Sequence, residues 1–204
     1  MRTIYWLGVT IFRAATTTLF GYRIIGKAKL VQNGGVLIAA NHESFLDPPL
    51  LGIAYDSEIN YLARKTLFKG FFKWLYTQWN AVPVDQDKPD MSSLKRIIKI
   101  LRSGERVVIF PEGARTLDGD FQPAQAGTGL IAAKSKAIVQ PIRIFGARDC
   151  LPRGSARVKM ARITLVVGDP IQFSPEELAA KGRDGYQMIA DRIMSEIAQL
   201  ELPH

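Results

Sequence analysis

One of the two histidines lies within the sequence and not at its last position, and the residues around it are of the types that acid–base chemistry requires. This residue, His42, lies five positions before Asp47 in the segment NHESFLDPP. The two side chains would lie on different faces of a continuous helix but can meet across a strand-to-helix turn. We expect such a turn, with Asp47 as N-cap and Pro48 at the first helical position. A carboxylate beside an imidazole orients it as a general base for an alcohol.

A second polar segment, VVIFPEGART at 107–116, follows another hydrophobic run. Gly113 allows the backbone to approach a ligand closely, and Arg115 offers a planar fork of donors that suits a phosphate. Each segment also has a simpler explanation, in which His42 and Asp47 are turn and capping residues and Arg115 is a solvated charge. Because both segments follow predicted strands, we expect them to meet at one edge of a sheet.

Together the two segments resemble the glycerolipid acyltransferase superfamily, most closely the 1-acylglycerol-3-phosphate (lysophosphatidate) acyltransferases. The resemblance rests on Asn-His-x4-Asp at 41–47 and Phe-Pro-Glu-Gly-Ala-Arg at 110–115. It runs from about Ala39 to Gly168. It also includes three shorter segments, RKTLF at 64–68, AVPVD at 81–85 and IVQPI at 138–142.

The resemblance implies a role for each residue of the two segments. His42 would be the catalytic base, and Asp47 would be its partner. Gly113 and Arg115 would help to hold the phosphate of the acceptor. Glu112 would orient groups in the same substrate-binding site.

One position departs from the pattern of the relatives. Gln86 stands where they usually carry an arginine after Val-Asp. If that arginine contributes to phosphate binding, the candidate cations that remain are Arg115, Arg64 and Lys65.

The resemblance implies direct transfer of a fatty acyl group from acyl-CoA or an acyl carrier protein to a free lysophospholipid hydroxyl. The leading acceptor is 1-acylglycerol-3-phosphate, which would become phosphatidate in phospholipid biosynthesis, with no metal and no organic cofactor. One alternative acceptor is a different lyso-lipid or an amino-acid-derived lipid. Gln140 and Arg143, in a strand that is usually more apolar, would recruit another acyl donor or change the shape of the acceptor site. The other alternative is a non-catalytic lipid-binding membrane protein.

The elements that position these residues follow from the hydrophobic pattern. Apolar runs rich in β-branched residues predict strands at 36–40, 59–63, 81–84, 107–110, 138–144 and 163–167. Helical periodicity predicts helices at 48–55, 67–78, 91–103, 124–136 and 185–200, and a further helix begins after the N-cap Ser174. This alternation predicts an α/β fold, a single domain around a mixed, largely parallel sheet flanked by helices.

The composition limits the partners of the chain. Lys and Arg number 27 against 19 Asp and Glu, so the formal charge is +8 and polyanions are attracted. No nucleic-acid-binding motif accompanies this charge, so we expect no nucleic acid partner. With one cysteine, Cys150, and two histidines, a structural zinc site is not expected.

The first residues form a nearly continuous apolar run at 4–12. Nine helical residues span roughly 13 Å, against about 30 Å for the hydrocarbon core of a membrane. We therefore predict an interfacial, amphipathic helix over residues 1–22 and an acyltransferase domain over 23–204. The alternative is a core helix of the catalytic domain.

A basic and aromatic helix is predicted near residues 67–79, with Lys65, Lys69 and Lys73 along one side. Its aromatic residues suit the headgroup boundary of an anionic membrane, which we expect to be the cytoplasmic face. Packing on the sheet and lining the acyl chain are alternatives for these aromatics. The side chains assigned to membrane contact are Trp6, Phe12, Phe71, Phe72 and Trp74.

Overall fold

The apolar runs form one mixed sheet in the computed structural model, which describes residues 3–84, 91–155, 157–179 and 181–203. Within these residues the sheet has seven strands in the order β1-β7-β6-β2-β5-β3-β4. Only β6 and β7 pair antiparallel, and every other pairing is parallel. The strands are β1 (Arg23–Ile25), β2 (Val36–Ala40), β3 (Ile59–Arg64), β4 (Ala81–Val84), β5 (Arg106–Ile109), β6 (Ile138–Phe145) and β7 (Thr164–Val167).

The central strand β2 explains where the polar segments lie. All five of its residues are buried, as expected for a strand covered on both faces. It pairs in parallel with β5 on one side and β6 on the other, and Ala39 is level with Ile109. The segments that follow β2 and β5 therefore leave the sheet at the same edge.

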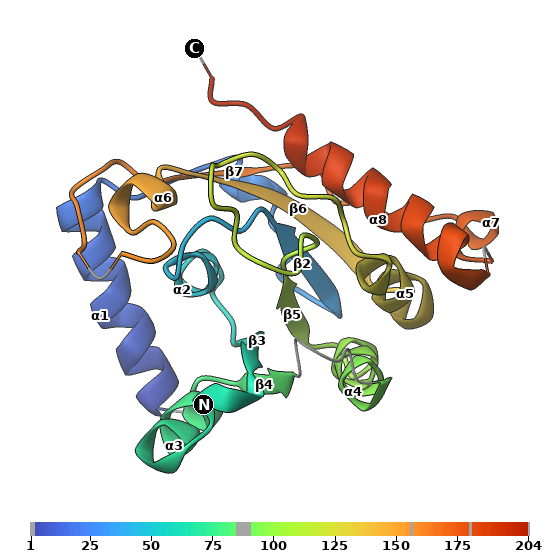
Figure 1. Ribbon diagram of the computed structural model, residues 1–204, viewed down its shortest axis with the longest axis horizontal. Coiled ribbons are helices and arrows are strands. Elements are labelled where there is room, and N and C mark those ends of the chain that lie inside the picture. The colour runs from blue at the N-terminus through green and yellow to red at the C-terminus, as the bar shows by residue number, and fades with distance from the viewer. Residues whose placement is uncertain (1–2, 85–90, 156, 180, 204) are drawn as a thin grey trace.

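Helices cover both faces of the sheet (Figure 1). One hydrophobic cluster includes residues of α1 and α2, and a second includes residues of α4, α5 and α8 on the other face. The α-helices are α1 (Thr3–Phe20), α2 (Asp47–Gly52), α3 (Gly70–Gln78), α4 (Met91–Arg102), α5 (Ala126–Ser135), α6 (Ala147–Cys150), α7 (Pro175–Leu178) and α8 (Gly182–Ala198). Two 3₁₀ helices, η1 and η2, cover Lys27–Lys29 and Lys65–Leu67.

The predicted α/β fold is confirmed, and two of its predicted strands, β2 and β4, have the observed bounds. The predicted helix 67–78 is wrong as one continuous element. It divides into η2 and α3, because Lys69 is extended and Gly70 has a φ of 49°. Lys65 and Lys69 therefore do not share one helical face. The short elements β1 and α6 were not predicted, since three or four residues carry almost no periodicity.

Helix α1 packs against the sheet with one side and is exposed on another. Tyr5 and Val9 belong to the hydrophobic core, and the Arg13 guanidinium donates to the Ile53 carbonyl oxygen at 2.7 Å. The exposed side carries the apolar residues Ile4, Leu7, Ile11 and Leu19. Among the described residues, no helix combines the length and the apolar character that crossing a membrane requires.

Two polar residues of β6, Gln140 and Arg143, have structural hydrogen-bond partners. Gln140 is fully buried, accepts from the Val31 amide and donates to the Gly168 carbonyl oxygen. The Arg143 guanidinium donates to the carbonyl oxygens of Ala198 and Leu200, at the C-terminus of α8. Unpaired C-terminal carbonyls of a helix favour a cation at this position.

Candidate active site

The side chains of His42 and Asp47 meet at the end of β2. Nδ1 of His42 lies 2.8 Å from Oδ2 of Asp47, whose side chain is fully buried. The same oxygen accepts the backbone N–H groups of Glu43 and Ser44, each at 2.7 Å. These amides hold the carboxylate of Asp47 in place inside the turn, so that it faces the imidazole.

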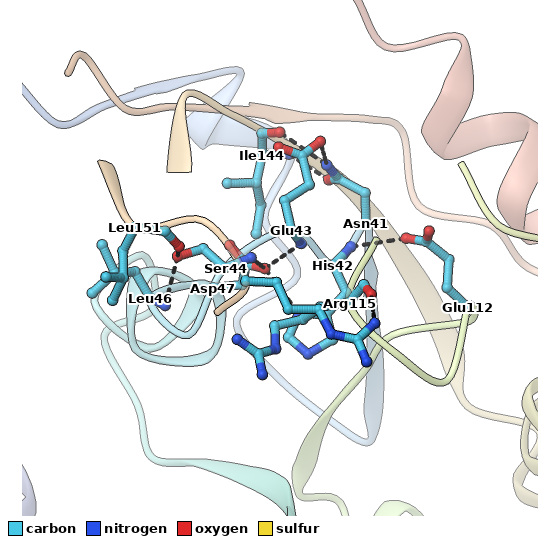
Figure 2. A network of polar contacts seen from close by, with 11 residues as sticks. Asn41, His42, Glu43, Ser44, Leu46, Asp47, Glu112, Arg115, Ile144 and Leu151 are labelled. Carbon is cyan, nitrogen blue, oxygen red and sulfur yellow. Dashed lines mark hydrogen bonds and ion pairs between the residues drawn. The ribbon is translucent and has the colours of Figure 1, made fainter. Parts of the chain in front are cut away.

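Asp47 is not the N-cap residue of α2, contrary to our expectation. The N-cap is Leu46, and Asp47 is the first residue of the helix. Its carboxylate points back to the turn that precedes the helix because the N–H donors of that turn and of His42 are there (Figure 2). The predicted meeting of Asp47 and His42 across a strand-to-helix turn is confirmed.

The imidazole of His42 is oriented by two neighbours. In the tautomer that carries its proton on Nδ1, His42 donates to Asp47 and the lone pair of Nε2 is available to accept a proton. The ring of Phe110 stacks on the imidazole, with 3.9 Å between centroids and 12° between planes. Phe110 was not predicted as a functional residue, although it lies in the quoted FPEG segment.

Glu112 joins the two polar segments. One carboxylate oxygen accepts the backbone N–H of His42 at 2.8 Å, and the other accepts that of Gln122 at 2.9 Å. The Thr116 amide also donates to the His42 carbonyl oxygen at 2.9 Å. Burial raises the pKa of Glu112. Since both oxygens are occupied by backbone amides, we interpret Glu112 as a positioning residue for His42.

Gly113 makes the turn that follows Glu112. Its φ of 75° lies in the left-handed region, and its amide donates to the Phe110 carbonyl oxygen at 3.0 Å. A side chain at this position would be strained, so glycine is the residue that the turn favours. The turn brings the next residues, up to Arg115, back towards the end of β2.

Arg115 lies close to the His42–Asp47 pair. Its guanidinium stacks on the ring of Phe45 at 3.4 Å from the centroid, and its buried Nη1 has no hydrogen-bond partner among the described residues. Burial lowers the pKa of Arg115, as do the charges of Arg153 and Arg64, while the charge of Asp47 raises it. A partly buried cation with an unused donor is suited to bind an anion.

The other predicted site residues are distributed as follows. Arg64 ends β3 and lies near enough to Arg115 to affect its pKa, and Lys65 begins η2. Gln86 lies outside the described residues. No group of three or more His, Cys, Asp and Glu side chains within the described ranges is arranged to hold a metal ion.

The residues assigned to membrane contact fall into two sets. Phe71, Phe72 and Trp74 are exposed on α3. Trp6 and Phe12 are half-buried and pack against the hydrophobic core. The exposed apolar side chains of α1 are therefore those of Ile4, Leu7, Ile11 and Leu19, and not those of Trp6 and Phe12.

Glu43 was not predicted to have a role, but its environment is unusual. Its carboxylate accepts from Nδ2 of Asn41 at 3.0 Å, and Asn41 is held by both backbone polar groups of Ile144 (Figure 2). Burial, followed by the negative charge of Asp47, raises the pKa of Glu43 to about 7. The folded protein therefore retains a proton on Glu43 at pH values where the unfolded chain has released it.

We expect Glu43→Gln to stabilise the protein at alkaline pH more than at acidic pH. Between the ordinary carboxyl pKa of about 4.5 and the folded value of about 7, the stability of the wild type falls as pH rises, because the unfolded state binds fewer protons. The variant lacks this pH-dependent loss. Its free energy of unfolding, relative to that of wild type, should therefore be roughly 1–2 kcal/mol higher at pH 8 than at pH 4, a range that allows for the partial exposure of Glu43. Urea unfolding at both pH values measures it, with the exposed Glu201→Gln as control. Equal gains at both pH values would contradict the expectation.

Comparison with known proteins assigns the family. Residues 21–145 match the Acyltransferase family. A protein from Bacillus subtilis (strain 168), named 1-acyl-sn-glycerol-3-phosphate acyltransferase, is 33% identical over 155 residues, which cover 74% of each chain. A Streptococcus pneumoniae protein of the same name is 25% identical over 83% of this chain and 62% of its own length.

The fold has a counterpart among solved structures. The crystal structure of the 1-acyl-sn-glycerophosphate (LPA) acyltransferase PlsC from Thermotoga maritima superposes with a TM-score of 0.74. The match covers 98% of this chain and 81% of that chain at 22% sequence identity. With the family match over more than half of the residues, the resemblance that we stated is confirmed: the chain belongs to the Acyltransferase family and is an O-acyltransferase.

Proposed function

We propose that this enzyme transfers a fatty acyl group from a thioester donor to the free hydroxyl of 1-acylglycerol-3-phosphate and so forms phosphatidate. The observation that carries the proposal is the cationic Arg115 next to an imidazole–carboxylate pair. The pair of His42 and Asp47 suits a hydroxyl nucleophile, and the guanidinium suits the phosphate of the same acceptor. The names of the Bacillus subtilis and Streptococcus pneumoniae relatives point to the same acceptor.

The proposed chemistry is a direct transfer. Nε2 of His42 removes the proton from the acceptor hydroxyl as its oxygen attacks the thioester carbonyl carbon. Asp47 stabilises the resulting imidazolium through Nδ1. The C–S bond then breaks, and His42 returns the proton to the thiolate of coenzyme A or of the acyl carrier protein. No metal, organic cofactor or acyl-enzyme takes part in these steps.

An acceptor panel tests the proposal. The purified protein is incubated with one acyl-CoA or acyl carrier protein donor and with lysophosphatidate, lysophosphatidylcholine or monoacylglycerol. Thiol release is followed by absorbance, and the lipid product is identified by mass spectrometry. We expect phosphatidate to form fastest. Thiol release with another lyso-lipid but not with lysophosphatidate would show that the other lipid is the acceptor. No thiol release with any of the acceptors would contradict the proposal.

We also propose that the protein associates with an anionic membrane at its cytoplasmic face. Lipid substrates reside there, and the chain carries a net charge of +8. Phe71, Phe72 and Trp74 are exposed on α3, which has no buried residue. Helix α1 adjoins this region, since Gly8 faces the indole of Trp79 just after α3. The exposed side chains of α1 and α3 thus offer apolar contacts with the membrane.

Replacing Phe71, Phe72 and Trp74 together with serine is expected to weaken binding to vesicles of phosphatidylglycerol and phosphatidylethanolamine. The loss should be at least about tenfold, because each exposed aromatic side chain would bury apolar area in the interface. Co-sedimentation measures it. Met188→Ser is the control, since Met188 is more exposed than any of the three aromatic residues but lies on α8, away from α3 (Figure 1). Unchanged vesicle binding by the triple variant would exclude these three side chains of α3 as the membrane contact and leave α1 as the candidate.

A further inference from the structure

The loop after α6 carries an arginine that lies next to the active site and that no motif of the sequence indicated. This loop is fixed to the catalytic turn by the fully buried Ser44, two residues after His42. Oγ of Ser44 donates to the Leu151 carbonyl oxygen at 2.8 Å, and Ser44 forms a β-bridge with Pro152. The next residue along the chain is Arg153, so its backbone starts from a fixed position.

The side chain of Arg153 extends to Arg115. Its Nη1 donates to the backbone carbonyl oxygen of Arg115 at 2.7 Å. The two charged groups are close enough for Arg153 to be the second-largest cause, after burial, of the lowered pKa of Arg115. Arg64, at the end of β3, contributes a further positive charge to the same neighbourhood.

The carboxylates nearby form their hydrogen bonds with other groups, although Oδ1 of Asp47 has no hydrogen-bond partner among the described residues. Asp47 accepts from His42 and from two backbone amides, and Glu112 accepts from two backbone amides. The Glu43 carboxylate is turned towards Asn41. Neither Arg115 nor Arg153 forms an ion pair in the part of the chain that the structure describes. Like charges that repel each other in this way are stabilised when an anion binds between them.

We propose that Arg153 is a second phosphate-binding residue, which together with Arg115 holds the phosphomonoester of the acyl acceptor. The inference rests on the proposed function, because it names the group of the acceptor that the site recognises. Two guanidinium groups match the charge of a phosphate dianion and supply several donors to its oxygens. A phosphodiester headgroup has one negative charge fewer and is bound less well by the same pair.

Four variants separate this role from a structural one. Arg153→Ala removes both the charge and the hydrogen bond to Arg115. Arg153→Gln keeps a donor for the Arg115 carbonyl oxygen but removes the charge, and Arg153→Lys keeps the charge. Arg157→Ala is the matched control. Arg157 is an exposed arginine of the same loop, and its hydrogen bonds join its backbone N–H and carbonyl oxygen to Oγ of Ser155. Thermal unfolding of each variant checks that the fold is retained.

We expect Arg153→Ala and Arg153→Gln to raise the KM for lysophosphatidate roughly tenfold to a hundredfold, with kcat changed by less than about threefold. Arg153→Lys should recover most of this loss, and Arg157→Ala should behave as wild type. Acylation of monoacylglycerol, which lacks the phosphate, should be equally slow in wild type and variants. A wild-type KM in Arg153→Gln would overturn the proposal, as would an equal loss of activity with both acceptors.

A binding measurement separates failure of this inference from failure of the proposed function. Glycerol 3-phosphate is titrated into wild type and Arg153→Gln and followed by ³¹P NMR, which needs no turnover. If wild type binds it and the variant does not, the phosphate site stands even where lysophosphatidate is not acylated. If wild type acylates lysophosphatidate and Arg153→Gln binds glycerol 3-phosphate as tightly as wild type does, the proposed function stands and the role of Arg153 is refuted.

Discussion

Replacing His42 with alanine is expected to lower kcat by roughly 10²–10⁴-fold, the usual contribution of a positioned general base. Asp47 and Phe110 would remain in place, but without the imidazole no group would take the proton of the acceptor hydroxyl. Thiol release from the acyl donor at saturating acceptor measures the effect. The KM for the acceptor should change little, because in the proposed site Arg115 and Arg153 hold the phosphate, and not His42.

The fold of this variant should be retained. The backbone N–H of residue 42 donates to the Glu112 carboxylate, and its carbonyl oxygen accepts from the Thr116 amide. Neither hydrogen bond involves the imidazole. Replacement of the only other histidine, as His204→Ala, serves as the matched control and should leave kcat unchanged. Wild-type turnover in the His42→Ala enzyme would remove His42 from the mechanism.

Gly129→Ala is expected to cost about 3 kcal/mol of stability or more, at the upper end of what overpacking in a core produces. Helices α5 and α8 approach so closely that a Cβ at Gly129 would lie 1.8 Å from the carbonyl oxygen of Tyr186. That oxygen belongs to the backbone of α8, so relief requires the two helices to separate. Equilibrium unfolding in urea measures the loss.

Gly127 provides a control in the same helix. A Cβ there meets no atom within 4 Å, and its backbone is in an ordinary helical conformation. Gly127→Ala should therefore stabilise the protein by roughly 0.5–1 kcal/mol, the benefit of alanine over glycine in a helix. The two positions lie two residues apart in α5 and differ chiefly in what surrounds the added methyl group. Equal stability of both variants would show that α5 and α8 pack less closely than described.

The fold class could be predicted from local pattern because each central strand carries its own signal. β2 is a run of five buried apolar residues and was predicted with the observed bounds. The break between η2 and α3 was missed, since it depends on the extended Lys69 and the left-handed Gly70 within a segment whose side chains have helical spacing. Periodicity reports side-chain pattern and not backbone dihedrals.

Competing partners decided where two polar side chains point, and for Asp47 they made the expected N-cap role wrong. Asp47 precedes a proline and fits the N-cap pattern, but its carboxylate is drawn to the amides of the preceding turn and to His42. Arg143 lies in β6, which pairs with β2, and the C-terminal end of α8 supplies its hydrogen-bond acceptors. In both cases competing partners decided the outcome, and the sequence does not rank them.

The amino-acid sequence by itself determined the α/β class, the meeting of His42 with Asp47 and the family, because each depends on residues close together or on whole motifs. Tertiary structure alone decided that Phe110 stacks on the imidazole, that Glu112 holds the His42 amide and that Arg153 reaches Arg115. The physical reason is the strand order. β2 lies between β5 and β6, so the segments that follow these strands converge at one edge of the sheet, however far apart they are in the chain.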